Sequence, residues 1–139
     1  MSKPMPVMVL GYAPPGTMPL NLGTQTIRRG LIYKGSSRLS AAHSLAVTRT
    51  SLSFTSGGFS SMIPLQIRFK AASTIRISQE PSNSLATGYT DTGSNSWTEW
   101  ENCFDCYQYG RKMFARAISQ GAPLQYEVQA TRRVAVGSQ

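Results

Sequence analysis

Acidic side chains are scarce in this chain of 139 residues: 6 Asp and Glu stand against 14 Lys and Arg, and the formal net charge is +8 at pH 7. Three of the acids are Glu99, Glu101 and Asp105, so residues 1–95 carry only two acids against nine bases. Such an imbalance favours a polyanionic partner, with nucleic acid first and an anionic membrane surface second. A basic surface that binds no partner is the alternative.

Groups that carry acid–base or nucleophilic chemistry are also few. His43 is the single histidine, and the acids outside 99–105 are Glu80, Asp91 and Glu127, which lie far apart in the sequence. The chain has no glycine-rich phosphate loop, no triad spacing and no metal-ligand spacing. We therefore expect no enzyme activity, no metal, no cofactor and no small-molecule substrate.

Cysteine and long apolar runs are limited in the same way. Cys103 and Cys106 are the only cysteines. Without a second pair they do not make a zinc site, so we expect them to face the core or an interface. No run approaches 18 apolar residues, and Pro4 and Pro6 interrupt the first apolar stretch. These features predict no transmembrane segment, no signal peptide and assembly in a cytoplasm.

The strongest pattern in the chain predicts one amphipathic helix over residues 96–120. Ser96 and Glu99 can form a capping box at its start, and Gly121 followed by Pro123 can end it. Gly110 is its one weak position. Apolar side chains recur at three- and four-residue steps along one stripe, which we expect to pack on a sheet and to form a dimer interface: Trp97, Trp100, Phe104, Tyr107, Phe114 and Ile118.

Residues 1–23 contain five of the eight prolines and predict an extended arm, with a short edge strand over residues 6–10. Extended apolar arms often pack on a neighbouring subunit, and a disordered tail is the alternative.

Alternating patterns predict a sheet over residues 24–80 and a further strand over 124–136. The run 62–71 is the clearest and should be central: its odd-numbered apolar residues point one way, and Arg68 and Lys70 the other. Further strands are predicted at 24–34, at 45–55 with a bulge near Arg49, and at 73–78; residues 34–38 are predicted as a basic loop.

We therefore predict one α+β domain, residues 1–139. It has an antiparallel sheet of five to six strands with one long amphipathic helix packed on one face, and it forms a dimer. The other face would be basic and rich in hydroxyl groups, which suits an RNA backbone. The residues predicted to contact RNA are Arg68, Lys70, Arg76, Arg28, Lys34 and Arg49.

Basic, Ser/Thr-rich strands followed by one strong helix resemble the small coat proteins of single-stranded RNA bacteriophages. The strands 45–55, 62–71 and 73–78 and the helix 96–120 match that layout over roughly half of the chain. The resemblance implies a dimer with a continuous sheet, helices on one face and RNA on the other, inside a capsid. Arg68, Lys70 and Arg76 would then face the RNA.

The expected function is that of a virion structural protein. As a coat subunit, it would self-assemble through a homodimer into a shell and package single-stranded RNA. The alternatives are a matrix protein of a negative-strand RNA virus, a jelly-roll capsid subunit with 124–136 as its last strand, and a cellular RNA-binding module.

Overall fold

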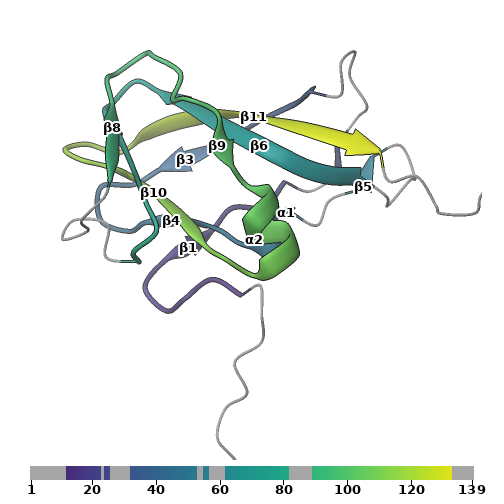
Figure 1. Ribbon diagram of the computed structural model, residues 1–139. Coiled ribbons are helices and arrows are strands. Elements are labelled where there is room, and N and C mark those ends of the chain that lie inside the picture. The colour runs from purple at the N-terminus through teal and green to yellow at the C-terminus, as the bar shows by residue number, and fades with distance from the viewer. Residues whose placement is uncertain are drawn as a thin grey trace, which may run out of the picture.

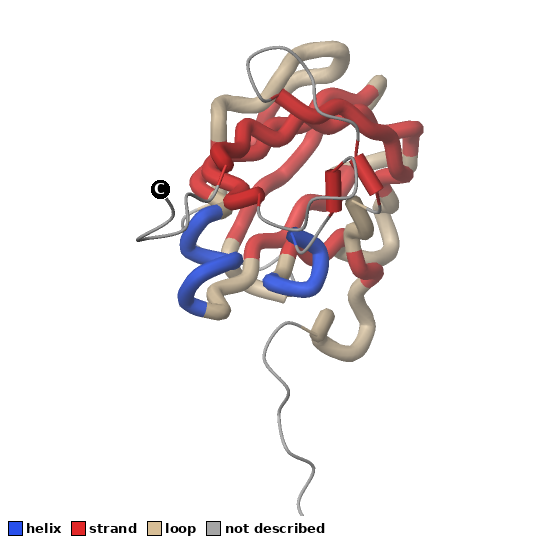
Figure 2. The backbone as a smooth tube through the Cα atoms, turned by 90° about the vertical axis from the view of Figure 1, so that its right-hand side faces the viewer, coloured by secondary structure: helices blue, strands red, loops and turns tan. Residues whose placement is uncertain are grey.

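Two β-sheets pack with their inner faces together in the computed structural model of the protein (Figure 1). The structure describes residues 12–22, 24–25, 32–52, 55–56, 62–81 and 89–132. The first sheet has five strands in the order β1-β4-β10-β7-β8, and the second has four in the order β3-β11-β6-β9. The second sheet runs across the upper part of Figure 1, and Figure 2 shows both helices at one end of the molecule.

The strands of the first sheet are β1 (Met18–Pro19), β4 (Leu45–Val47), β7 (Ile75–Ser78), β8 (Thr90–Thr92) and β10 (Met113–Ala117). Those of the second are β3 (Ile32–Leu39), β6 (Met62–Ala71), β9 (Glu101–Asn102) and β11 (Ala122–Arg132). A small two-stranded sheet joins β2 (Thr24–Gln25) and β5 (Thr55–Ser56), and the helices are α1 (Arg49–Leu52) and α2 (Phe104–Tyr109).

The hydrophobic core lies between the two sheets and follows the two-residue period of the strands. From the four-stranded sheet it takes buried side chains such as Tyr33, Leu39, Ile67, Phe69, Leu124 and Val128. From the five-stranded sheet it takes Leu45, Val47, Ile75, Ile77, Met113, Ala115 and Ala117. Each sheet therefore covers the apolar face of the other.

The predicted helix over residues 96–120 is wrong. This segment instead contains β9, the six-residue helix α2 and the five-residue strand β10. Gly110 ends α2 in a left-handed conformation, with φ 73° and ψ 15°. After it the apolar residues that enter the core are Met113, Ala115 and Ala117, which have the period of a strand.

The predicted α+β class is wrong for the same reason. The protein is mostly β, with 49% of residues in strands and two short helices among the described residues. The apolar face of the sheet that contains β6 is covered by a second sheet, which is the other common way to bury such a face. None of the helices in the described part is long and apolar enough to cross a bilayer.

Strand β6 has the bounds predicted from the sequence and has neighbours on both sides, β11 and β9. Ile67 and Phe69 are buried as expected, but Ile63 and Leu65 are only half-buried. The cause is a β-bulge: Gln129 pairs with Gln66 and the next residue of β11 pairs with Pro64, which leaves Leu65 as the extra residue.

Other predicted boundaries are corrected as well. The predicted strand 45–55 ends at Val47 and continues into the helical turn α1. The predicted loop 34–38 is part of β3, which begins near the end of the predicted strand 24–34. The C-terminal strand begins at Ala122, and residues 133–136 lie outside the described part.

The described part of the N-terminal arm packs on its own chain. Strand β1 pairs in parallel with β4, and Leu20 and Leu22 are buried. The predicted edge strand over residues 6–10 lies outside the described residues.

The substitution Gly110→Ala distinguishes this structure from the helix that the sequence predicts. A side chain at a positive φ costs about 1–3 kcal/mol, so we expect a loss of about 1–2 kcal/mol in the free energy of unfolding. In a continuous helix the same change would stabilise by about 1 kcal/mol. Urea unfolding followed by circular dichroism gives the sign. Gly93→Ala is the control, since a Cβ there meets nothing within 4 Å. A Gly110→Ala variant that is more stable and more helical would contradict the structure.

Candidate nucleic-acid interface

The outer face of the four-stranded sheet brings together basic side chains from two strands. Across β3, β11 and β6, Lys34 lies opposite Glu127, which lies opposite Arg68. In the next row on the same face, Ser36 lies opposite Gln125, which lies opposite Lys70. Directly opposed residues of neighbouring strands point to the same side of a sheet.

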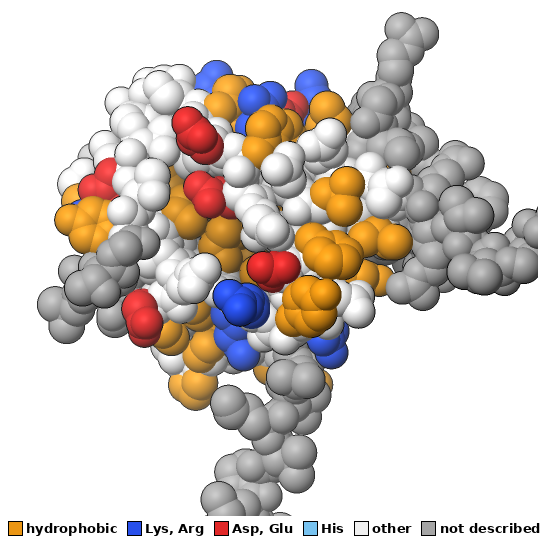
Figure 3. Space-filling model, in the orientation of Figure 1, with side chains coloured by type: hydrophobic (Ala, Val, Ile, Leu, Met, Phe, Trp, Pro, Cys, Tyr) orange, Lys and Arg blue, Asp and Glu red, His pale blue; other side chains and the backbone are white. Residues whose placement is uncertain are grey.

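We call this surface the basic face and define it by Lys34, Arg38, Arg68 and Lys70. Arg38 joins it because it alternates with Lys34 and Ser36 along β3 and is exposed. In Figure 3, Lys and Arg side chains gather with hydrophobic ones along the upper edge, over the strands at the top of Figure 1.

Glu127 is the acidic centre of the basic face. Its side chain is only 8% exposed, so its charge needs close partners. Arg68 Nε donates to Glu127 Oε1 at 2.7 Å, and Arg68 Nη2 also contacts that oxygen. Lys34 Nζ lies 3.5 Å from Glu127 Oε2. The carboxylate thereby holds one cation from each neighbouring strand.

Two indole rings hold the same arginine. The Arg68 guanidinium carbon lies 4.5 Å from the ring centroid of Trp97 and 4.6 Å from that of Trp100. Lys70 Nζ lies 5.8 Å from the Trp97 centroid. Cation–π contacts of this kind contribute about 0.5–2 kcal/mol each.

Thr98 positions these rings beside β6. Its backbone N–H donates to the Phe69 carbonyl at 2.8 Å, and its hydroxyl accepts the Phe69 N–H at 2.9 Å. Thr98 is buried, so the segment that carries both tryptophans is fixed at the edge of the sheet.

The cations of the basic face are not equivalent. Arg68 is engaged by Glu127 and by both rings, whereas the Lys34 side chain is 67% exposed and Arg38 is also exposed. Lys70 is half-buried and makes only the long contact to Trp97 among the described residues. Lys34, Arg38 and Lys70 can therefore reach phosphates, while Arg68 fixes the architecture.

The structure divides the six residues predicted to contact RNA. Arg68, Lys70 and Lys34 share the basic face, and Arg28 lies outside the described residues. Arg76 is in the other sheet, where its Nε and Nη2 donate to Asp91 at 2.8 and 3.0 Å and its guanidinium carbon lies 3.8 Å from the Tyr89 centroid.

Arg49 also has a local structural role. Its Nε donates to the Tyr107 carbonyl and its Nη2 to the Gln108 carbonyl, both at 2.9 Å. These carbonyls belong to the last turn of α2, which the guanidinium caps.

The six residues predicted to form a dimer interface do not share one stripe. Trp97 and Trp100 lie on the basic face with Arg68. Phe104 and Tyr107 belong to α2, and Tyr107 packs against the core. Phe114 is buried in β10, and Ile118, just beyond β10, is 46% exposed.

The sequence reasoning missed Glu127 and Arg38 as members of this site. Glu127 is the only acid after Asp105, and it falls on the polar side of an alternating run. An acid on the polar side of a strand, in a chain with so few acids, was the available signal for an ion pair.

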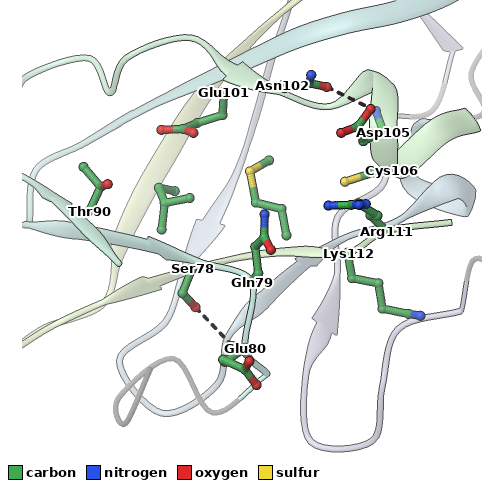
Figure 4. A pocket seen from close by; sticks show the side chains of 12 residues that line it. Ser78, Gln79, Glu80, Thr90, Glu101, Asn102, Asp105, Cys106, Arg111 and Lys112 are labelled. Atoms are coloured by element: carbon green, nitrogen blue, oxygen red, sulfur yellow. Dashed lines mark hydrogen bonds between the residues drawn. The ribbon is translucent and has the colours of Figure 1, made fainter. Parts of the chain in front are cut away.

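A hollow of about 460 Å3 lies beside α2, between β7–β8 and β9–α2 (Figure 4). Glu101 of β9 and Asp105 of α2 both lie along one side of it, and Thr90, Cys106 and Arg111 also line it. Burial, with a smaller effect of Glu99, raises the pKa of Glu101. Its carboxylates make this hollow a poor site for a polyanion.

The cysteines in and beside that hollow are weak nucleophiles. Burial raises the pKa of Cys106 to about 11 and raises that of Cys103 further. Both thiols therefore stay protonated at neutral pH. Within the described ranges no group of three or more His, Cys, Asp or Glu side chains could hold a metal ion.

Comparison with protein-family models, with curated proteins and with solved structures finds no match for this chain. The function must therefore be argued from the geometry of the basic face.

Replacing Arg68 tests whether the buried charge of Glu127 is stabilised by the Arg68 guanidinium. Arg68→Ser leaves the buried carboxylate with Lys34 alone and removes both cation–π contacts, so we expect a loss of about 2–4 kcal/mol in unfolding free energy. Adding Glu127→Gln removes the unpaired charge. The double variant should therefore be more stable, by about 1 kcal/mol or more in unfolding free energy, than the sum of the two single effects predicts. Urea unfolding of the two single variants and the double variant measures the coupling. Strictly additive effects would show that the pair is not coupled.

Proposed function

We propose that the protein is a virion structural subunit, of the capsid or matrix type, that binds single-stranded RNA through its basic face. The role is structural rather than catalytic, and the partners are RNA and further copies of this chain. Assembly would take place in the host cytoplasm.

The observation that carries the proposal is the strand register across β3, β11 and β6, which places Lys34, Arg38, Arg68 and Lys70 on one face, with Lys34 and Arg68 on either side of Glu127. Cations several ångströms apart on a sheet suit successive phosphates of a nucleic-acid backbone. The net charge of +8 supports the same reading, since it attracts polyanions at long range.

The architecture bears on the type of subunit. The resemblance to RNA bacteriophage coat proteins included the helix 96–120, which is absent from the structure. A body of two packed sheets supports the jelly-roll capsid or matrix alternative better than the phage layout. The basic sheet face is common to all of these proposals.

Self-association is supported by the edge of the four-stranded sheet. Strand β3 has eight residues and, among the described residues, pairs only with β11. Edge strands of a sheet can pair with strands of other chains. We expect a dimer or larger species in sedimentation at micromolar concentration. A monodisperse monomer would argue against a shell-forming role.

The double substitution Lys34→Ser/Lys70→Ser tests the RNA-binding face. On single strands each phosphate contact contributes a slope of about −0.7 in log affinity against log salt concentration. Losing two contacts should reduce the steepness of the slope by about 1.4 and weaken binding at low salt. Fluorescence anisotropy with a labelled oligouridine over a salt series measures both.

The matched control removes two positive charges elsewhere. Arg111 and Lys112 line the hollow beside α2, away from the basic face. Arg111→Ser/Lys112→Ser should leave the slope almost unchanged. If the control pair flattened the slope and the Lys34/Lys70 pair did not, RNA would bind elsewhere.

A further inference from the structure

A hollow of about 280 Å3 lies within the basic face, beside Trp97. Its other lining residues are Lys34, Gly35, Ser36, Gln125, Tyr126 and Glu127. It thus joins an indole ring, an amide, a hydroxyl and an ammonium group on the surface that faces the proposed RNA. At roughly 30 Å3 per water molecule, the hollow is larger than a few solvent molecules require.

The floor of this hollow is a rigid part of the sheet. Gly35 lies opposite Tyr126 in the β3–β11 register, and a Cβ at Gly35 would collide with the Tyr126 phenol. Tyr126 is buried, so its ring packs closely against the backbone of Gly35. The next pair along the two strands is Ser36 and Gln125, and both of these side chains point outward.

We propose that this hollow binds one unpaired nucleobase of the RNA. The inference depends on the proposed function and specifies the ligand further. The protein would bind single-stranded RNA through contacts to a base as well as to the phosphate backbone. The base packs against Trp97, the Gln125 amide and the Ser36 hydroxyl hydrogen-bond its edge, and Lys34 and Lys70 contact the flanking phosphates.

The contacts around Trp97 allow this arrangement. Lys70 lies 5.8 Å from the ring centroid, near the outer limit of about 6 Å for a cation–π contact. Its flexible side chain can exchange that contact for a phosphate. Arg68 stays fixed by Glu127, and Thr98 holds the segment that carries Trp97 against β6, so the indole keeps its place when Lys70 moves.

The chemistry also selects unpaired bases. A base in a duplex has both faces stacked and its pairing edge occupied, whereas an unpaired base can present a face to an aromatic ring and an edge to an amide. An amide offers both a donor and an acceptor, which makes Gln125 able to hydrogen-bond any of the bases.

Affinity for oligouridine, compared with an abasic oligomer of the same number of phosphates, tests the subsite separately from the electrostatic contacts. The full-length protein should bind oligouridine about tenfold more tightly than the abasic oligomer. Trp97→Ala should bring that ratio close to one with little change in the salt slope, and Trp97→Phe should keep most of it.

Trp100→Ala is the matched control. Both rings contact Arg68 at nearly the same distance, but Trp97 alone of the two lines the hollow. Trp100→Ala should therefore keep the ratio. Gln125→Ala, at an exposed position, should reduce it several-fold without affecting the fold.

The outcomes separate the two proposals. Equal, salt-dependent binding of both oligomers by the unmodified protein would overturn the base subsite and leave the proposed function standing. A ratio unchanged by Trp97→Ala and by Gln125→Ala would overturn it as well. If neither oligomer binds, the base subsite and the proposed function are both wrong.

Discussion

The ion pair between Glu127 and Arg68 determines the arrangement of the whole basic face. A carboxylate on the outer side of a sheet is normally solvated, but Glu127 is almost covered and must be neutralised by its neighbours. Arg68 from β6 and Lys34 from β3 provide that charge. Trp97 and Trp100 then enclose the guanidinium, so one acid links two strands and the edge segment into a rigid surface. On this surface Arg38 and most of the Lys34 side chain are exposed to solvent.

The fold uses its excess of positive charge in two ways. Arg76 is paired with Asp91, Arg49 caps α2, and Arg116 Nε donates to the Ala41 carbonyl at 2.8 Å. These side chains stabilise the five-stranded sheet and its helices. Lys34, Arg38 and Lys70 have weak contacts or exposed positions instead. Charge at exposed positions adds little to stability. Because these three cations are not needed to hold the fold together, the outer face of the four-stranded sheet is the best candidate for a polyanion-binding surface.

Local patterns predicted the strands that have one clear period, and failed where two periods fit the same residues. Residues 62–71 alternate without ambiguity, and β6 has those bounds. Residues 113–117 fit a helical stripe through Phe114 and a strand through Met113, Ala115 and Ala117, and only packing against the facing sheet decides between them. The basic face was partly predictable, because Arg68 and Lys70 share one parity. The pairing of Arg68 with Glu127 and Trp97 was not, since it joins segments 59 and 29 residues apart.

Ultraviolet cross-linking of the protein to bound oligouridine, followed by mass spectrometry of the peptides, tests the location of the RNA most directly. Our account predicts cross-links in the peptides that carry Trp97, Lys34 and Lys70, all on one side of the four-stranded sheet. Cross-links confined to Arg76 and Arg116 on the five-stranded sheet, or to the hollow beside α2, would contradict it.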